Sequence, residues 1–178
     1  MITLRTRRLR LRPVTLGDMA IFEAFYGDPE VMAIRKYGVL DAQAAREQVE
    51  GMVEHWRAHA FGMWAVEELR SGAFTGECGL RWREDGADVE LSYGLYAKYR
   101  GRGLATEAAN AALDFGVGVL GLARIVALSR GDNHVSHRVL EKLGMTLESR
   151  TDDGEFGLVR YRYPPVGRKE ERYDDGSD

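Results

Sequence analysis

A glycine-rich loop constrains this chain more than any other feature of its sequence. The loop, residues 99–106 (YRGRGLAT), follows a strand-like segment and opens an alanine-rich segment that predicts a helix from about Leu104 to Val119. Glycines let the backbone approach a ligand closely, and the first N–H groups of a helix have no partner within it. Such a loop binds a phosphate or pyrophosphate, aided by the helix dipole and by two arginines. Taken alone, the segment also fits a tight turn with a solvated arginine pair.

The spacing within the loop separates three classes of phosphate-binding motif. A P-loop needs G-x-x-x-x-G-K-[ST], and the loop has neither that spacing nor the lysine. A dinucleotide fingerprint needs a third glycine where Thr106 stands, and an acidic residue about 20 positions on, where Arg124 opens the next strand. The third pattern, R/Q-x-x-G-x-G/A, is satisfied by Arg100, Gly103 and Ala105.

Length and charge limit the function classes. A chain of 178 residues predicts a single domain, over residues 1–165, followed by a charged tail at 166–178 that we expect to be disordered. Its 25 basic and 28 acidic side chains argue against a general nucleic-acid binder and against a polybasic membrane-surface protein. The absence of a signal-peptide pattern or an apolar run of about 20 residues favours a cytoplasmic protein.

Metal binding is not expected. The lone Cys78 excludes an intrachain disulfide and a thiolate-rich metal site. His55 and His59 have a metal-compatible spacing, but Trp56 stands where a zinc protease motif has glutamate.

The hydrophobic pattern predicts an α+β fold with a mostly antiparallel sheet. Residues Thr3–Arg12 alternate in part and predict one strand with its arginines outward. One strand–helix–strand unit, 88–129, makes two strands parallel. Gly94 inside the first of these strands indicates a bulge or a close backbone approach. The other predicted helices are 15–26, a short one after Asp28, 42–60 and 133–143, and the other predicted strands are 62–67, 74–82, 124–129, 146–150 and 156–163.

Five motifs together resemble one known family. They are TRRLRLRP at the start, DPEVM at 28–32, GMWAVE at 62–67, YRGRGLATEA at 99–108 and DNHVSHRVLEKLGM at 132–145. In this order the chain resembles the GCN5-related N-acetyltransferases (GNAT), most closely the ribosomal-protein N-terminal acetyltransferase (RimJ/RimL-like) branch. The resemblance implies a mixed, mostly antiparallel sheet splayed between its fourth and fifth strands and flanked by about four helices. The pantetheine arm of acetyl-CoA would enter between those strands.

The resemblance also implies a set of cofactor-binding residues. The loop backbone would hold the pyrophosphate, and the end of strand 88–97 would pair with the pantetheine amides. Asn133 matches an asparagine that contacts the cofactor arm, and Ser136 matches a serine near the thioester sulfur. The full set is Leu95, Tyr96, Ala97, Arg100, Gly101, Arg102, Gly103, Leu104, Ala105, Thr106, Asn133 and Ser136.

Two residues are candidates for proton transfer. Glu90 alternates with Gly94 and could face the cleft as the general base; it could equally be a solvent-facing carboxylate. Ser136 is the candidate acid or water-holding residue, with backbone bonding in the first helical turn as the alternative. Leu140 stands where many family members have a tyrosine that acts as the general acid, so Tyr93 or Tyr96 could take that role. A bulge near Gly94 could supply an oxyanion N–H.

The leading hypothesis is an acetyl-CoA-dependent N-acetyltransferase that acts by direct attack of a primary amine on the thioester. The acceptor would be a protein N-terminus or a small amine. A non-catalytic acyl-CoA-binding sensor is the second hypothesis, and a nucleic-acid or ribosome-contacting module built on the early arginines is the third. We expect those arginines to be a solvated outer strand face and Arg100 and Arg102 to serve the anion. No membrane partner is expected, and a homodimer is the commonest assembly of soluble proteins.

Overall fold

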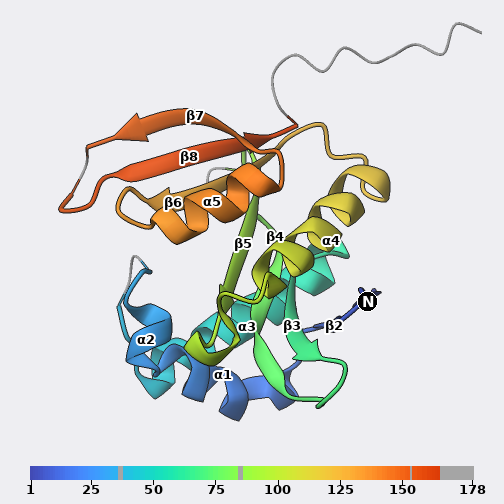
Figure 1. Cartoon of the computed structure of the whole chain (residues 1–178). Helices are drawn as coiled ribbons and strands as arrows, with labels where there is room; N and C mark the ends of the chain where they lie inside the picture. The colour runs from blue at the N-terminus through green and yellow to red at the C-terminus, as the bar shows by residue number, and fades with distance from the viewer. Residues whose placement is uncertain (36–37, 84–85, 153, 165–178) are drawn as a thin grey trace, which may run out of the picture.

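A computed structural model describes residues 1–35, 38–83, 86–152 and 154–164. The tail expected at 166–178 lies outside these described residues. Eight strands form one mixed sheet in the order β1-β2-β3-β4-β5-β6-β8-β7, with helices on both faces (Figure 1). The strands are β1 (Leu4–Arg5), β2 (Leu9–Pro13), β3 (Met63–Glu68), β4 (Phe74–Trp82), β5 (Val89–Leu95), β6 (Ile125–Arg130), β7 (Thr146–Thr151) and β8 (Leu158–Tyr163).

The α+β class is confirmed, with five α-helices in the described residues where the resemblance implied about four. Short 3-10 turns, η1 (Leu16–Asp18) and η2 (Ala97–Tyr99), precede α1 and the glycine-rich loop. In the part of the chain that the structure describes, no helix is both long and apolar enough to cross a membrane. The α-helices are α1 (Met19–Tyr26), α2 (Pro29–Met32), α3 (Ala42–His59), α4 (Leu104–Gly118) and α5 (His134–Lys142).

The helices begin where their capping residues predict. The Asp28 carboxylate accepts a hydrogen bond from the backbone N–H of Glu30 at 2.8 Å, and the Asp41 carboxylate accepts one from Ala44 at 2.8 Å. Both bonds satisfy N–H groups that a helix start leaves without partners. The apolar face of α3 is buried, and Ala60, which is exposed, ends the helix in the left-handed conformation.

The single strand predicted over Thr3–Arg12 is wrong. Strands β1 and β2 form an antiparallel hairpin that pairs Leu4 with Leu11. The Thr6 side chain holds the turn, because its hydroxyl accepts a hydrogen bond from the Leu9 N–H at 3.0 Å. A threonine hydroxyl that bonds nearby backbone competes with strand pairing, and the strict alternation begins only at Leu9.

The sheet is covered on both faces, and β3 is buried from Met63 to Glu67. Trp64 and Val66 of β3 pack in the core beneath α4, whereas Met63 and Ala65 pack in a second core with α1, α2 and α3. This alternation of side chains across a strand explains why β3 reads as a continuous apolar run rather than an alternating one. The two cores fix the sheet between its helical layers.

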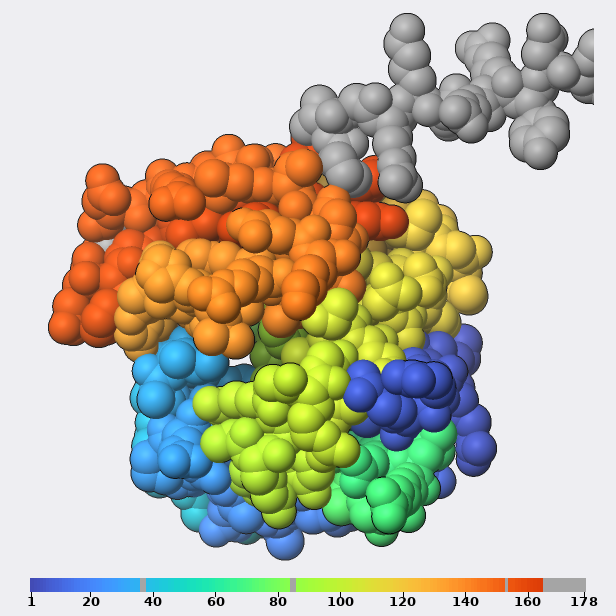
Figure 2. Space-filling model, in the orientation of Figure 1, coloured from blue at the N-terminus to red at the C-terminus, as the bar shows by residue number. Residues whose placement is uncertain are grey.

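The predicted splay is confirmed, one strand later in the count because the N-terminal segment contributes two strands. Strands β5 and β6 pair in parallel only at Val89–Ile125 and Glu90–Val126, and β6 pairs onward with β8. Residues 91–95 of β5 therefore face an opening. Figure 2 shows a hollow there, bounded by the segment around α2, the loop after β5 and the α5 region.

Gly94 marks a close approach rather than a bulge. The β4–β5 register runs without a shift from Gly76–Leu95 to Trp82–Val89, whereas the irregularity in this part of the sheet lies between Val66 and Glu67. A methyl group at position 94 would overlap the Arg35 guanidinium. The bulge expected near Gly94 is therefore absent from the described β5, and a neighbouring side chain takes the space instead.

Candidate active site

The loop before α4 presents a row of unpaired N–H groups. Gly101 and Gly103 have φ values of 71° and 73°, in the left-handed region, and Gly103 is the N-cap of α4. Among the described residues, no hydrogen-bond acceptor is found for the N–H groups of residues 101–106. Consecutive unpaired N–H groups at a helix start are able to bind an anion.

The two loop arginines bind protein groups. The Arg100 guanidinium donates to the backbone oxygens of Leu95 at 3.0 Å and Glu30 at 2.9 Å. Arg102 donates to the Glu68 carboxylate at 2.7 Å. Both charges therefore already have partners, because a strand end, a short helix and a glutamate meet beside the loop. Anion binding would rest on the loop backbone more than on these side chains.

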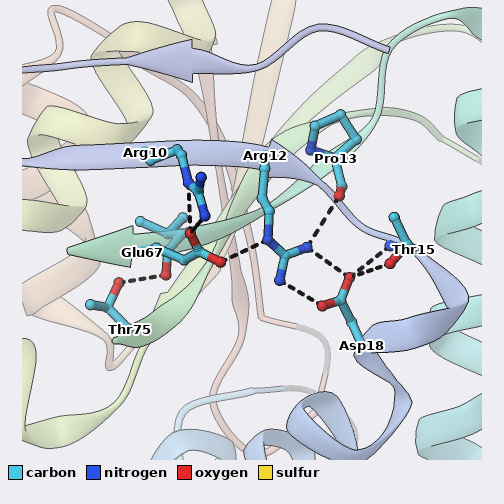
Figure 3. A network of polar contacts seen from close by, with 8 residues as sticks. Arg10, Arg12, Pro13, Thr15, Asp18, Glu67 and Thr75 are labelled. Carbon is cyan, nitrogen blue, oxygen red and sulfur yellow. Dashed lines mark hydrogen bonds and ion pairs between the residues drawn. The ribbon is translucent and has the colours of Figure 1, made fainter. Parts of the chain in front are cut away.

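Three of the five early arginines, Arg8, Arg10 and Arg12, form ion pairs, whereas Arg5 and Arg7 are exposed. Arg10 and Arg12 each donate through Nε to the Glu67 carboxylate, at 2.8 Å and 2.7 Å (Figure 3). Arg12 also binds both oxygens of Asp18, at 2.6 Å and 2.8 Å. Burial would raise the pKa of Asp18, but hydrogen bonds from Arg12 and Thr15 outweigh it and lower the pKa below its ordinary value. The expectation of a solvated strand face is therefore wrong for the two arginines of β2.

A third glutamate ties the N-terminal hairpin to the loop. Glu107, in the first turn of α4, accepts hydrogen bonds from the Thr6 hydroxyl at 2.6 Å and from the Arg8 Nε at 2.6 Å. The Arg8 Nη1 donates to the backbone oxygen of Arg102 at 2.8 Å. Sequence reasoning missed this contact because its partners lie about a hundred positions apart.

An open groove lies beside the loop. It has a volume of about 590 Å³ and carries two basic side chains, Arg5 and Lys142, which the sequence had not singled out. The groove runs along α4, so an anion on the loop would have room to extend into it. Its lining residues are Arg5, Thr6, Gly103, Thr106, Glu107, Asn110, Ala111, Asp114 and Lys142.

Two of the residues named for proton transfer meet beside the opening. The Tyr93 hydroxyl of β5 lies 2.9 Å from Ser136 Oγ of α5. Asn133 caps α5, and its side-chain oxygen accepts the Ser136 N–H at 3.1 Å. Burial raises the pKa of Tyr93 well above its ordinary value, although the hydrogen bond with Ser136 opposes this, so Tyr93 is a neutral proton donor. Tyr96 packs edge-on against Phe25 instead.

Glu90 stands apart from that pair. Its carboxylate lies 3.5 Å from a guanidinium nitrogen of Arg81 and 3.5 Å from one of Arg83. It occupies the closed end of the β5–β6 pair, opposite Val126. Because side chains alternate along a strand, Glu90 projects from the face of β5 opposite to Tyr93.

A buried cluster that the sequence did not predict lies on the same face as Glu90. The Glu77 side chain is 2% exposed, accepts a hydrogen bond from the Tyr26 hydroxyl at 2.6 Å, and pairs with Arg35 at 2.7 Å. Burial raises the pKa of Tyr26 well above its ordinary value, and the neighbouring Glu77 carboxylate adds to this. The one sequence signal for the cluster was Gly94.

The described residues hold no group of three metal ligands. His55 is occupied on both ring nitrogens: Nε2 accepts the Trp82 N–H at 2.9 Å, so Nδ1 carries the proton and donates to the Phe61 oxygen at 2.9 Å. These bonds leave neither nitrogen of His55 for a metal ion. They tie α3 to the end of β4.

Comparison with known proteins agrees with this geometry. The family model of the acetyltransferase (GNAT) domain matches residues 8–146. The uncharacterised protein YkkB of Bacillus subtilis is 34% identical over 143 residues, which cover 79% of this chain and 83% of that protein. The uncharacterised N-acetyltransferase p20 of Bacillus licheniformis is 28% identical, covering 87% and 88%.

Solved structures give the same result. An acetyltransferase from Agrobacterium tumefaciens superposes with a TM-score of 0.81 at 28% identity, covering 92% of this chain and 94% of that one. RimL, a ribosomal L7/L12 alpha-N-protein acetyltransferase solved with coenzyme A, superposes with a TM-score of 0.78 at 15% identity, covering 90% and 97%. The latter shows the shared fold alone. The resemblance drawn from the sequence motifs is confirmed, and the chain belongs to the GNAT family of acetyltransferases.

Proposed function

We propose that this protein transfers the acetyl group of acetyl-CoA to a primary amine. The observation that carries the proposal is the row of N–H groups at residues 101–106, which have no acceptor within the described chain and adjoin the opened β5–β6 pair. A pyrophosphate supplies the acceptor oxygens that these groups lack. GNAT acetyltransferases use acetyl-CoA, and the chain's own loop fits that cofactor.

The proposed cofactor site extends from the loop in two directions. Leu95 at the end of β5 and the two residues that follow it, 96–97, offer backbone groups to the pantetheine amides, and Asn133 at the start of α5 flanks the same opening. In the other direction, Arg5 and Lys142 give the groove beside α4 two positive charges for a nucleotide phosphate. The residues proposed from the sequence thus remain the cofactor set, with Arg5 and Lys142 added.

Acyl transfer demands few protein groups. A primary ammonium has a pKa near ~10, so it must lose a proton before its nitrogen attacks the thioester carbonyl. As the carbon–nitrogen bond forms and the carbon–sulfur bond breaks, the leaving thiolate takes a proton. The Tyr93–Ser136 pair is placed to donate that proton, and a backbone N–H near Gly94 to bind the oxyanion. Holding amine and thioester together supplies much of the remaining rate.

Glu90 is proposed as the base, acting on the amine through water. Its carboxylate lies 3.5 Å from guanidinium nitrogens of Arg81 and Arg83. The acceptor itself is proposed only as a primary amine, either a protein N-terminus or a small molecule. Two ribosomal-protein acetyltransferases superpose well, but at 15% identity they support the fold and not the acceptor.

Calorimetric titration with coenzyme A, NAD and ATP tests the cofactor. We expect binding of coenzyme A alone, followed by thiol release from acetyl-CoA with amines. In Gly101→Ala, the left-handed backbone is strained, and we expect the Kd for coenzyme A to rise about tenfold, equal to ~1.4 kcal/mol. Gly121→Ala is the matched control, because Gly121 has φ 66° and follows the opposite end of α4 from the loop.

The outcomes separate enzyme from sensor. No binding of coenzyme A by the unaltered protein would refute the proposal. Tight binding without thiol release in the presence of peptides and small amines would favour the acyl-CoA sensor instead. Equal loss of coenzyme A affinity in Gly121→Ala would show that the loop has no special part in binding.

A further inference from the structure

A buried carboxylate, on the face of β4 that packs against α1, supports an inference about the acceptor. Glu77 is 2% exposed, and an ionised carboxylate at that depth requires a counter-charge. Its ion-pair partner within the described residues is Arg35, at 2.7 Å, and Tyr26 donates a hydrogen bond at 2.6 Å. None of the three residues belongs to the Tyr93–Ser136 pair or to the phosphate-binding loop.

The Arg35 guanidinium occupies a particular place on β5. Gly94 stands directly opposite Glu77 in the β4–β5 register, within the part of β5 that has separated from β6. A methyl group at position 94 would overlap the guanidinium, so the glycine is required for Arg35 to reach Glu77. The Arg35 guanidinium therefore lies against the β5 backbone, at the position where we propose that the acceptor reaches the thioester carbonyl.

The segment that carries Arg35 spans the opening. From the β5 side, Arg100 donates to the backbone oxygen of Glu30 at 2.9 Å. From the end of β6, Arg130 donates to the backbone oxygen of Ala33 at 2.9 Å. The segment around α2 that carries Arg35 therefore borders the hollow seen in Figure 2. The Arg35 side chain is 23% exposed. A ligand that approaches β5 from this rim meets the guanidinium first.

We propose that Glu77, Tyr26 and the Gly94 backbone form the subsite for the acceptor's ammonium group, and that Arg35 occupies it in the acceptor's place. An ammonium and a guanidinium both donate hydrogen bonds to a carboxylate, so one can replace the other on Glu77. A buried carboxylate discriminates against anionic acceptors, because it would then lie beside a second negative charge. The acceptor is accordingly a primary amine that enters as a cation. This inference rests on the proposed acetyl transfer.

The substitution Arg35→Lys tests the subsite without an added acceptor. It puts a primary ammonium on Glu77, and after loss of one proton the new amine should attack acetyl-CoA. A carbon–nitrogen bond forms, the carbon–sulfur bond breaks, the amine's second proton leaves, and the thiolate is protonated. We expect the protein to gain the mass of one acetyl group, which peptide mapping should locate on the new lysine. The rate of this self-acetylation should fall at least about tenfold when Glu77→Gln is added.

The control is Arg10→Lys, which places a lysine on the partly buried Glu67, away from the opening. If the ion pair between Arg35 and Glu77 is purely structural, thermal stability would change in either variant, but neither new lysine would be acetylated. Should Arg35→Lys fail to fold, Arg35→Met is titrated with n-butylammonium in the presence of coenzyme A. Its affinity should exceed that of the unaltered protein at least about tenfold, and thiol should be released from acetyl-CoA.

For Arg35→Lys, the inference is overturned if the new lysine is not acetylated or is acetylated no faster than the lysine of the Arg10→Lys control. For Arg35→Met, it is overturned if n-butylammonium binds no better than to the unaltered protein, or binds without being acetylated. Failure of the proposed function is distinguishable, because the unaltered protein would then not bind coenzyme A, or would bind it without releasing thiol from acetyl-CoA with any of the peptides or small amines. Acetylation of the new lysine that depends on Glu77 supports both.

Discussion

Arg8 is the residue through which the N-terminal hairpin should influence cofactor binding. Its guanidinium joins Glu107 of α4, at 2.6 Å from Nε, to the backbone oxygen of Arg102, at 2.8 Å from Nη1. In Arg8→Met both bonds are lost, while Glu107 keeps its bonds from the Thr6 hydroxyl and the Arg8 backbone N–H. The perturbation therefore releases the loop on one side without leaving Glu107 unpaired.

The magnitude follows from the exposure of the pair. The Arg8 side chain is 33% exposed and that of Glu107 is 16% exposed. The cost lies between that of an exposed ion pair and that of a buried charged hydrogen bond, so we expect about 1–2 kcal/mol of folding stability to be lost. At about 2–4 °C per kcal/mol, the midpoint of thermal unfolding should fall by several degrees. The Kd for coenzyme A should rise about fivefold to tenfold, equal to ~1–1.4 kcal/mol.

The matched control is Arg10→Met. Arg10 also bonds a glutamate from the hairpin, but its partner Glu67 lies on β3 and remains paired with Arg12. Differential scanning fluorimetry and calorimetric titration with coenzyme A measure both variants. Stability should fall in both, and coenzyme A affinity in Arg8→Met alone. Equal affinity loss in the two variants, or none in Arg8→Met, would refute the positioning role of Arg8.

Two further predictions concern pH and proton transfer. Burial lowers the pKa of His55 below its ordinary 6.5, so the unfolded chain takes up the proton more readily than the folded one. Stability should therefore be intact above about pH 6.5 and decline as the pH falls through the folded pKa; urea unfolding between pH 7.5 and 5.5 should show this decline, and His55→Gln should flatten it. Tyr93→Phe and Ser136→Ala should each lower kcat about 10²-fold, with coenzyme A affinity unchanged in Tyr93→Phe, and kcat of the double variant should be little lower, because a paired donor acts as a unit. Additive losses in thiol-release assays would contradict the pairing.

Local rules in the sequence determined the elements and the loop. The cap residues Asp28 and Asp41 start helices where their side chains satisfy the first N–H groups. Gly101 and Gly103 adopt the left-handed backbone that only glycine accepts readily, so the loop's shape follows from its own residues. The GNAT fold followed from five motifs in order, and the family match over residues 8–146 confirmed it.

Only the tertiary structure decided what the charged side chains do. The partners of Arg10, Arg8 and Tyr26 are glutamates that lie 57, 99 and 51 positions along the chain. Periodicity tells which face of a strand a residue occupies, but the residue opposite depends on register between strands that are distant in sequence. For that reason the arginines of β2, which the sequence suggested were solvated, form ion pairs. Likewise, Gly94 of β5 is the place where Arg35 reaches the buried Glu77. The sequence determined where a cofactor could bind, whereas strand pairing and the packing of α1 and α2 decided what surrounds it.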